Sequence, residues 1–276
     1  MTSLDIVIKI GSMALIRQED NDIDYNILSR LSAELKPGMA LISSGATEIG
    51  RLDYFKRTGR ELGGDREDVI TDYAAQGQAI LMSQYRQFIK PEYSVRQVLV
   101  EHTHFNARSK REHIRQMLLR CAVQGAIPII NYNDPVSVEE NRKLELSVLR
   151  ENADTVVECI DNDETAAVIA ELVGAKTLVI LSSTDGIYRD AGDPSTLAES
   201  VGGENADKLE ANIRALQESC VGASRAGAQG ARAKLEYIIP AARHGTTVII
   251  GHSRHRVADL VSGSARCTRI ALNMRQ

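Results

Sequence analysis

The sequence has little cysteine, and its four cysteines lie far apart in a chain of 276 residues. No two of them have the Cys-x-x-Cys spacing of a zinc or redox site, and the histidines have no cysteine or carboxylate partners at zinc-site spacing. The sequence therefore predicts reduced core thiols in a cytoplasmic protein, at Cys121, Cys159, Cys220 and Cys267.

The chain also lacks long hydrophobic runs. No apolar segment reaches the length that spans a bilayer, and Lys9 interrupts the apolar N-terminal stretch, unlike the core of a signal peptide. The net charge of -4 creates no field that would recruit nucleic acid or an anionic membrane. These absences favour small-molecule chemistry.

Apolar segments of strand length alternate with amphipathic segments of helix length along the chain. Strands are predicted at residues 5–10, 39–43, 95–100, 126–130, 177–182 and 246–251. Helices are predicted near residues 23–35, 71–89, 106–124, 163–173, 205–217 and 230–243. This alternation predicts an α/β protein with a mostly parallel sheet and helices on both faces. No repeat or linker clearly divides residues 1–276, which are predicted to form a single domain.

Small, hydroxyl or acidic residues follow four of the predicted strands. Ligands of open α/β sheets bind beyond the carboxyl ends of the strands, so these residues indicate a binding site. A turn would produce the same residue types at any one strand, but their recurrence favours a site. The segments are GSM after 5–10, SSGA after 39–42, NYND after 126–130 and SSTDGIY after 177–181.

Lys9 stands in the first strand between Ile8 and Ile10, although a strand covered on both faces is normally apolar throughout. In one interpretation the strand lies at the edge of the sheet and the lysine reaches water. In the other, Gly11 and Ser12 let backbone N–H groups approach an anion that the lysine also binds. The second interpretation predicts a phosphate site.

A glycine-spaced loop opens a helix in residues 222–245, with Lys234 one turn into the helix. Neither a Walker A motif nor a G-x-G-x-x-G fingerprint is present. A helix N-terminus beside a lysine favours an anion, whereas a flexible loop with a solvated lysine is the alternative. Pro240 is expected to kink or end this helix, because it cannot donate a hydrogen bond to Glu236.

Four consecutive polar residues, Asp161 to Glu164, interrupt the segment VVECIDNDETAAVIAEL at residues 156–172. A helix N-cap requires one such side chain, which accepts a hydrogen bond from an N–H group of the first turn. Capping therefore explains one of the four residues, and the others indicate a functional role.

Seven segments follow one another in the region of residues 5–262, namely KIGS, LISSGA, AAQGQAILMSQY, GAIPIINYND, DNDETAAVIAEL, TDGIY and GAQGARAK. In this order they resemble the amino acid kinase family, and within it the glutamate 5-kinases. The resemblance implies a three-layer α/β/α sandwich around a mostly parallel sheet. It also implies that the terminal phosphoryl group of ATP is transferred, with Mg²⁺, to the side-chain carboxylate of glutamate at the start of proline synthesis.

The resemblance also implies roles for individual residues. Lys9 and Lys234 are expected to contact the transferred phosphoryl group, with Asp163 aligning the two lysines. The amino-acid substrate is expected to be held by Ser44, Gly45, Asp134 and Asn162. Nucleotide contacts are expected from Lys9, Gly11, Ser12, Ser182, Ser183, Asp185, Gly186, Tyr188, Gly227, Gly230 and Lys234. The part up to about residue 160 is then acceptor-binding and the part from about 161 nucleotide-binding, and no residue is assigned to the metal ion.

Two alternatives stay open at this point. In one, the same fold phosphorylates another acceptor, namely another amino acid, carbamate or a small phosphate. In the other, a non-catalytic member binds nucleotide or amino acid and regulates a partner, which Lys9, Lys234 and Asp163 disfavour because binding alone does not need them. The expected partners are the small-molecule substrate and further copies of the chain in a homodimer or homotetramer, with no nucleic acid and no membrane.

Overall fold

The structure is a computed structural model that describes residues 3–17, 19–137, 139–152, 156–159, 161–190, 192–220 and 230–272. Its strands are β1 (Ile6–Ile10), β2 (Ile16–Arg17), β3 (Asp22–Ile23), β4 (Met39–Ser43), β5 (Ser94–Val100), β6 (Ala126–Tyr132), β7 (Thr177–Ser182), β8 (Ser200–Gly203), β9 (Thr247–His252) and β10 (Cys267–Leu272). Its α-helices are α1 (Tyr25–Glu34), α2 (Ala46–Thr58), α3 (Arg66–Phe88), α4 (His102–Asn106), α5 (Arg108–Val123), α6 (Glu139–Asn152), α7 (Asn162–Val173), α8 (Ala206–Ser219), α9 (Gly230–Arg243) and α10 (Val257–Ser262). Short 3₁₀ helices are η1 (Ser12–Leu15), η2 (Asp134–Val136) and η3 (Pro194–Thr196).

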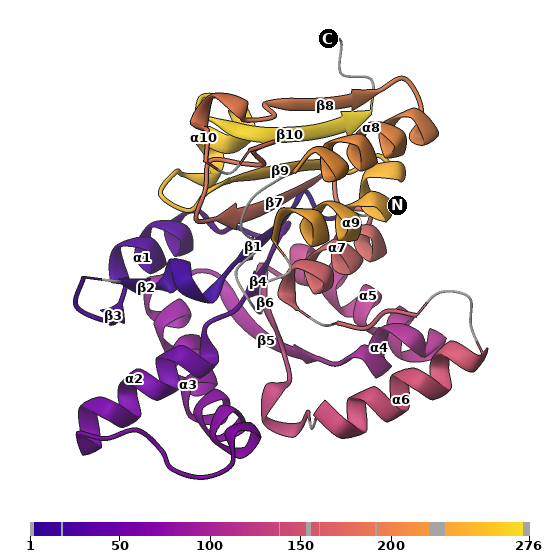
Figure 1. The fold of residues 1–276 in the computed structure, drawn as a ribbon. Helices are drawn as coiled ribbons and strands as arrows, with labels where there is room; N and C mark the ends of the chain where they lie inside the picture. Colours follow the sequence, from indigo (N-terminus) through magenta and orange to yellow (C-terminus); the bar gives the residue numbers. More distant parts are fainter. Residues whose placement is uncertain are drawn as a thin grey trace. The chain divides into compact units, whose positions relative to one another are not determined.

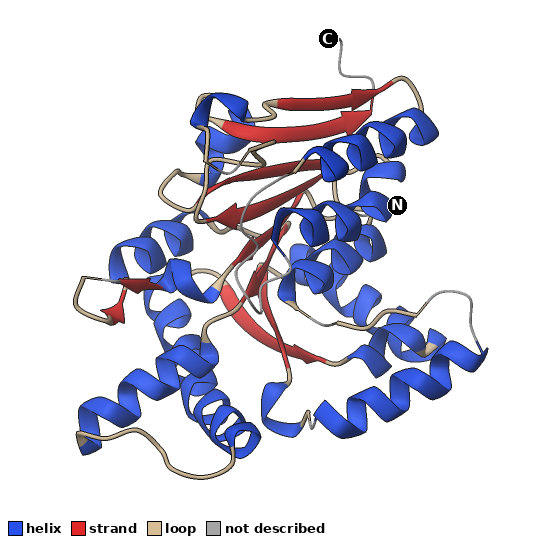
Figure 2. Ribbon diagram, in the orientation of Figure 1, coloured by secondary structure: helices blue, strands red, loops and turns tan. Residues whose placement is uncertain are grey.

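A mostly parallel sheet of eight strands, with helices around it, confirms the predicted α/β class (Figure 2). The strand order is β5-β6-β4-β1-β7-β9-β10-β8, and β2 pairs with β3 in a separate two-stranded sheet. The pairs β5–β6, β1–β7, β7–β9 and β10–β8 are parallel, whereas β9–β10 is antiparallel. The six strands predicted from the sequence are β1, β4, β5, β6, β7 and β9, each within two residues of its expected bounds.

The chain divides into two compact units that are described separately below. Unit 1 consists of Met1–Ile10, Gly38–Ile42 and Asp163–Gln276, and unit 2 consists of Gly11–Pro37 and Ser43–Asn162. No helix of the described residues has an apolar stretch of the length needed to cross a bilayer.

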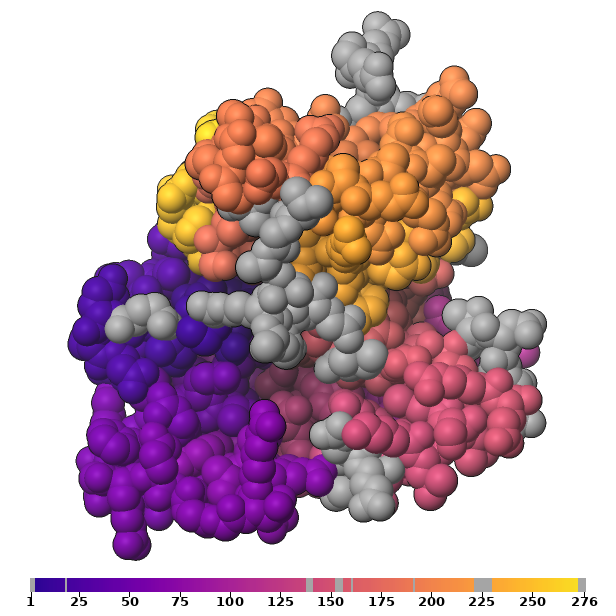
Figure 3. Space-filling view, in the orientation of Figure 1, coloured from indigo at the N-terminus to yellow at the C-terminus, as the bar shows by residue number. Residues whose placement is uncertain are grey.

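In unit 1, helices α8 and α9 lie side by side over one face of the strands (Figure 1). Their side chains form the orange surface over that face (Figure 3). Helix α8 begins where the side chain of Asn205 accepts a hydrogen bond from the N–H of Lys208, at 2.9 Å. Helix α9 does not end at Pro240 but continues to Arg243, so the loss of one backbone N–H donor does not end the helix here.

In unit 2, α2 and α3 approach closely enough that two glycines are required at their contact. A Cβ atom on Gly50 would lie 1.9 Å from the carbonyl oxygen of Tyr73, and one on Gly77 would lie 1.8 Å from that of Ala46. Helix α3 begins five residues before its expected start, because the side chain of Asp65 caps it by accepting a hydrogen bond from the N–H of Glu67. This packing fixes α2, whose first residue, Ala46, is the last residue of the SSGA segment of the sequence.

Candidate active site

Three charged side chains of unit 1 form one ion-pair cluster. The Nζ of Lys9 lies 2.7 Å from Oδ1 of Asp163, and the Nζ of Lys234 lies 2.8 Å from Oδ2 of the same carboxylate. The side chains of Lys9 and Asp163 are 11% and 6% exposed, and that of Lys234 is 23% exposed. The structure thus brings together the three residues for which the sequence predicted a catalytic role, although that role itself stays a prediction.

Each member of this cluster is positioned by a different element. Lys9 lies in β1, which pairs with β7 inside the sheet, so it is not the edge-strand lysine of the alternative interpretation. Asp163 lies in the first turn of α7, where a carboxylate is also favoured by the helix dipole. Lys234 lies in the second turn of α9. A single buried carboxylate therefore orients two ammonium groups that come from distant parts of the chain.

Charge complementarity controls the ionisation of Asp163. Burial alone would raise the pKa of this carboxyl group, but the ammonium groups of Lys9 and Lys234 outweigh burial and hold the pKa below its usual range. Asp163 is therefore ionised at neutral pH, and its negative charge lies within ion-pair distance of both lysines.

The last residue of β7 and the segment that follows it together carry five residues expected to bind the nucleotide. Ser183 is exposed, and Ser182 and Tyr188 are partly buried. The carboxylate of Asp185 pairs with the guanidinium of Arg254 at 2.6 Å, a partner that the sequence did not reveal. Gly186 is required sterically, because a Cβ atom there would lie 2.4 Å from Oγ1 of Thr268.

The other residues expected at the nucleotide are distributed over both units. In unit 2, Gly11 is extended, with φ -81°, and precedes η1, which begins at Ser12. In unit 1, Gly230 has the left-handed φ of 60° that favours glycine and is the first residue of α9. Gly227 lies outside the described residues. Nucleotide binding by these residues stays a prediction.

Unit 2 contains a hydrogen-bonded cluster at the ends of β4 and β6. The Nδ2 of Asn162 donates to Oγ of Ser44 and to Oδ1 of Asn131, both at 2.9 Å. Asn131 in turn donates to Oε1 of Gln78 at 2.9 Å. The Oδ1 of Asn162 is buried and accepts no hydrogen bond from a described residue. Buried acceptors are normally satisfied, so this oxygen indicates a ligand that donates a hydrogen bond.

Two further residues expected at the substrate lie in unit 2. Gly45 adopts the left-handed φ of 105° at the start of α2, a conformation that favours glycine. Asp134 begins η2, and its carboxylate forms no hydrogen bond or ion pair with a described residue. Burial raises the pKa of Asp134 to about 6, opposed by the positive charge of Arg142 and reinforced by the negative charge of Glu48. An unpaired, partly buried carboxylate is a suitable partner for a ligand cation.

We expect Asp134→Asn to raise the free energy of unfolding at pH 8 by about 1–3 kcal/mol, because the variant avoids burying an unpaired negative charge. The folded pKa is raised from 3.8 to about 6. Stability is therefore greatest below the unfolded pKa and is lost as pH rises through about 6. Urea unfolding of the parent and the variant at pH 5 and pH 8 measures this difference.

The advantage of the Asp134→Asn variant is expected to be larger at pH 8 than at pH 5, where part of the parent's Asp134 is protonated. Asp65→Asn, which changes an exposed capping carboxylate of α3, serves as the control and is expected to show no such gain. An equal difference at the two pH values, or a less stable variant at pH 8, would contradict the raised pKa.

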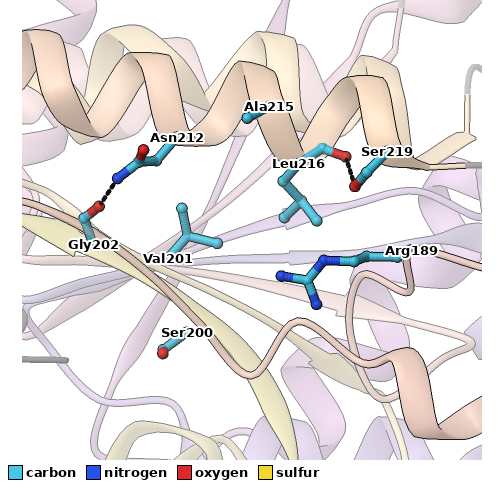
Figure 4. Close-up of a pocket in the computed structure, with 8 residues that line it drawn as sticks. All are labelled: Arg189, Ser200, Val201, Gly202, Asn212, Ala215, Leu216 and Ser219. Carbon is cyan, nitrogen blue, oxygen red and sulfur yellow. Dashed lines mark hydrogen bonds between the residues drawn. The ribbon is translucent and has the colours of Figure 1, made fainter.

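A pocket of about 300 Å³ lies in unit 1 between α8 and β8 (Figure 4). Asn212 donates a hydrogen bond to the carbonyl oxygen of Gly202 on one side of it, and the guanidinium of Arg189 lies on the other. None of the residues expected at the substrate or the nucleotide lines it. The lining residues are Arg189, Ser200, Val201, Gly202, Asn212, Ala215, Leu216 and Ser219.

Sequence reasoning missed Asn131, Gln78 and Arg254 as neighbours of the candidate site. Asn131 stands in the NYND segment and Gln78 in the AAQGQAILMSQY segment, so the sequence signal was present for both. The pairing of Arg254 with Asp185 joins residues 69 positions apart, and no local pattern indicates it.

Comparison with known proteins relates the chain to a family of kinases. The sequence model described as "Amino acid kinase family" matches residues 6–252. A glutamate 5-kinase of Bacteroides thetaiotaomicron is 32% identical over 90% of this chain and 64% of its own length. Another, of Alkaliphilus metalliredigens, is 27% identical over 96% of this chain and 95% of its own length. The chain thus spans less than two thirds of the first relative and nearly all of the second.

Solved structures with a similar fold include two other kinases. Carbamate kinase from Giardia lamblia bound to AMP-PNP has a TM-score of 0.60 at 13% identity, over 99% of this chain and 100% of that one. UMP kinase from Bacillus anthracis has a TM-score of 0.53 at 10% identity, over 98% of this chain and 97% of that one. At such identities the likeness shows the fold alone.

Proposed function

The chain belongs to the amino acid kinase family, and on this premise we propose that it transfers the terminal phosphoryl group of ATP to the side-chain carboxylate of glutamate. The relatives named glutamate 5-kinase support the choice of acceptor. A solved structure of the same fold bound to AMP-PNP supports ATP as the donor.

The observation that carries the proposal is the pairing of Asp163 with both Lys9 and Lys234. In the proposed reaction a glutamate carboxylate oxygen bonds to the terminal phosphorus of ATP, the bond from that phosphorus to the bridging oxygen breaks, and ADP leaves. A carboxylate is already nucleophilic, so catalysis requires positioning and neutralisation of the charge on the transferred group rather than a strong base. Two oriented ammonium groups supply that neutralisation.

The Mg²⁺ ion that accompanies ATP in such reactions neutralises phosphate charge when it is bound. Mg²⁺ in kinase sites is held by one or two carboxylates, water and the substrate phosphates rather than by a cage of protein ligands. The described residues contain no group of three or more acidic, histidine or cysteine side chains placed to hold a metal.

The acceptor side of the proposal rests on unit 2. The unpaired carboxylate of Asp134 and the unsatisfied Oδ1 of Asn162 suit a ligand with an ammonium group. An amino acid carries such a group, whereas carbamate and UMP do not. Asn162 is followed directly in the chain by Asp163, so the residues proposed for the acceptor and for the phosphoryl group are consecutive.

We make further proposals together with this function. The part of the chain up to about residue 160 is proposed to bind the acceptor and the part from about 161 to bind the nucleotide. The protein is proposed to work in the cytoplasm as a homodimer or homotetramer, at the start of proline synthesis.

The proposed function is tested by measuring ADP release by the purified protein with ATP and Mg²⁺ against a panel of acceptors. The panel contains glutamate, aspartate, N-acetylglutamate, carbamate and UMP. We expect the highest kcat/KM with glutamate, because the relatives are named glutamate 5-kinase and the residues proposed for the acceptor suit an ammonium group. A higher kcat/KM with another acceptor would reassign the acceptor, and no ADP release with any of them would contradict the kinase function.

A further inference from the structure

A cation without a direct ion-pair partner among the described residues lies beside the candidate acceptor site. Arg142 is on α6 and is partly buried, and it forms no ion pair with a described residue. By contrast, Arg150 on the same helix pairs with Glu158. A partly buried arginine without a direct ion-pair partner indicates an anionic ligand, because the guanidinium carries donors for a planar anion.

The surroundings of Arg142 connect it to the acceptor cluster. Its guanidinium carbon lies 5.9 Å from the centre of the Tyr132 ring. Tyr132 is buried, and its N–H donates to Oδ1 of Asn131, which also accepts from Asn162. Its hydroxyl oxygen lies 3.0 Å from Oγ of Ser137. Arg142 is therefore placed against the ring of a residue whose backbone N–H belongs to the same hydrogen-bonded cluster.

The charge of Arg142 acts on Asp134 although the two groups form no direct ion pair. The positive charge of Arg142 lowers the pKa of Asp134, so the two groups are close enough to interact. They nevertheless form no ion pair within 4.0 Å. A guanidinium and a carboxylate without a direct ion pair between them suit the two charged groups on the α-carbon of an amino acid, a carboxylate and an ammonium.

We propose that Arg142 binds the α-carboxylate of the acceptor while Asp134 binds its ammonium group, so that the site selects an amino acid with both groups free. This inference rests on the proposed function, since it assigns the non-reacting end of the same acceptor. The side-chain carboxylate is thereby left without a strong cation at this end and is available to the transferred phosphoryl group.

A structural role for Arg142 makes a different prediction. Stacking on Tyr132 would hold α6 in place, because cation–π contacts of this kind stabilise proteins. Such a contact is indifferent to the charge of the acceptor. The discriminating measurement is therefore a comparison of two acceptors that differ only at the α-carboxylate.

The experiment compares glutamate with glutamate α-amide, which keeps the ammonium group and the reacting carboxylate. Kinetics are measured at pH 7, where Asp134, with its pKa of about 6, is mostly ionised and the amide's amino group is mostly protonated. For Arg142→Met we expect the KM for glutamate to rise about 10- to 100-fold with little change in kcat. The KM for the α-amide is expected to stay unchanged.

Two further variants sharpen the test. Arg142→Lys keeps the charge but not the planar fork, so its KM for glutamate is expected to lie between those of the parent and Arg142→Met. Arg150→Met removes the paired arginine of the same helix and is expected to leave both KM values unchanged. The parent enzyme itself is expected to prefer glutamate to the α-amide, which tests the proposal even where a variant folds poorly.

Each other outcome contradicts a defined part of the account. An equal rise in both KM values for Arg142→Met would show that Arg142 acts through the structure of α6 and would overturn the proposal. Unchanged KM values for both acceptors would show that Arg142 does not contact the acceptor, and would also overturn the proposal. A parent protein that phosphorylates glutamate without preference over the α-amide overturns this inference alone, whereas one that phosphorylates neither overturns the proposed function as well.

Discussion

Replacing Lys9 or Lys234 by methionine is expected to lower kcat by about 10²–10³-fold, with the fold intact. Methionine keeps the apolar length of the side chain and removes the ammonium group that we propose neutralises the transferred phosphoryl group. Because the effect arises in the transition state, kcat should fall more than the KM for ATP rises. Steady-state kinetics on each variant, with circular dichroism to check folding, measure it.

Lys176→Met is the matched control for the two lysine variants. Lys176 also lies in unit 1 and pairs with one carboxylate, that of Asp5 at 2.7 Å, but its side chain is 70% exposed. Its removal is expected to leave kcat unchanged. A folded Lys234→Met protein within about twofold of the parent would contradict the two-lysine mechanism and favour the regulatory alternative.

The second large effect is expected for Asp163→Asn, which should lower both kcat and stability. The amide matches the carboxylate in shape but cannot hold two ammonium groups by charge, so kcat is expected to fall by about 10²-fold or more. It also leaves the buried ammonium of Lys9 without its counter-charge, and removing one partner of a buried ion pair costs about 3–5 kcal/mol. Urea unfolding and steady-state kinetics measure the two effects.

A double-variant cycle separates the loss of the carboxylate from the exposure of an unpaired cation. Lys9→Met/Asp163→Asn is expected to be more stable than Asp163→Asn alone, because it removes the cation that the single variant leaves unpaired. Asp5→Asn, which breaks the exposed pair with Lys176, is the control and is expected to cost less than about 1 kcal/mol. Additive stability changes in the cycle would contradict the coupling of these charges.

The stabilisation by Asp163 also has a defined pH dependence. The folded pKa of this carboxyl group is lowered because the two lysines outweigh burial. Its contribution is therefore fully present above the unfolded pKa of an aspartate and is lost as the pH falls through the lowered folded value. The parent and Asp163→Asn should accordingly converge in stability under strongly acidic conditions.

Six strands of the sheet could be predicted from the sequence, whereas β8 and β10 could not. Strands β4, β6 and β7 are runs of buried aliphatic residues, which local pattern detects. Strand β10 contains Thr268 and Arg269, and β8 ends in two glycines, so neither resembles a strand by composition. Their pairing depends on contacts between residues that are distant in the chain.

Helices α2 and α6 were not predicted from the sequence, for a different reason in each case. Helix α2 contains Gly50, which is unfavourable in a helix interior unless a close neighbour requires it, as the carbonyl of Tyr73 does here. In α6, Leu144 and Val148 are exposed and Leu146 is buried, so its apolar residues do not form one face. The position of Arg142 beside Tyr132 follows from this helix, and local sequence pattern could not place it.

The candidate site was predicted more fully than its surroundings. The resemblance grouped Lys9, Asp163 and Lys234, and the structure places them in direct contact. It also named Ser44 and Asn162, which form a hydrogen bond. The partners that tune these groups, such as Arg142 beside Asp134, come from tertiary packing, which no single motif encodes.

The most direct test of the proposed reaction follows an oxygen atom from the acceptor. Glutamate labelled with ¹⁸O in its side-chain carboxylate is incubated with the protein, ATP, Mg²⁺ and hydroxylamine, and the phosphate released is examined by mass spectrometry. Phosphoryl transfer makes a bond between phosphorus and a labelled oxygen, and hydroxylamine then attacks the carbonyl carbon, so phosphate leaves with the label. The proposed reaction predicts that ¹⁸O-labelled phosphate forms in amounts equal to those of ADP and glutamyl hydroxamate. ADP released with unlabelled phosphate, or no ADP released, would contradict it.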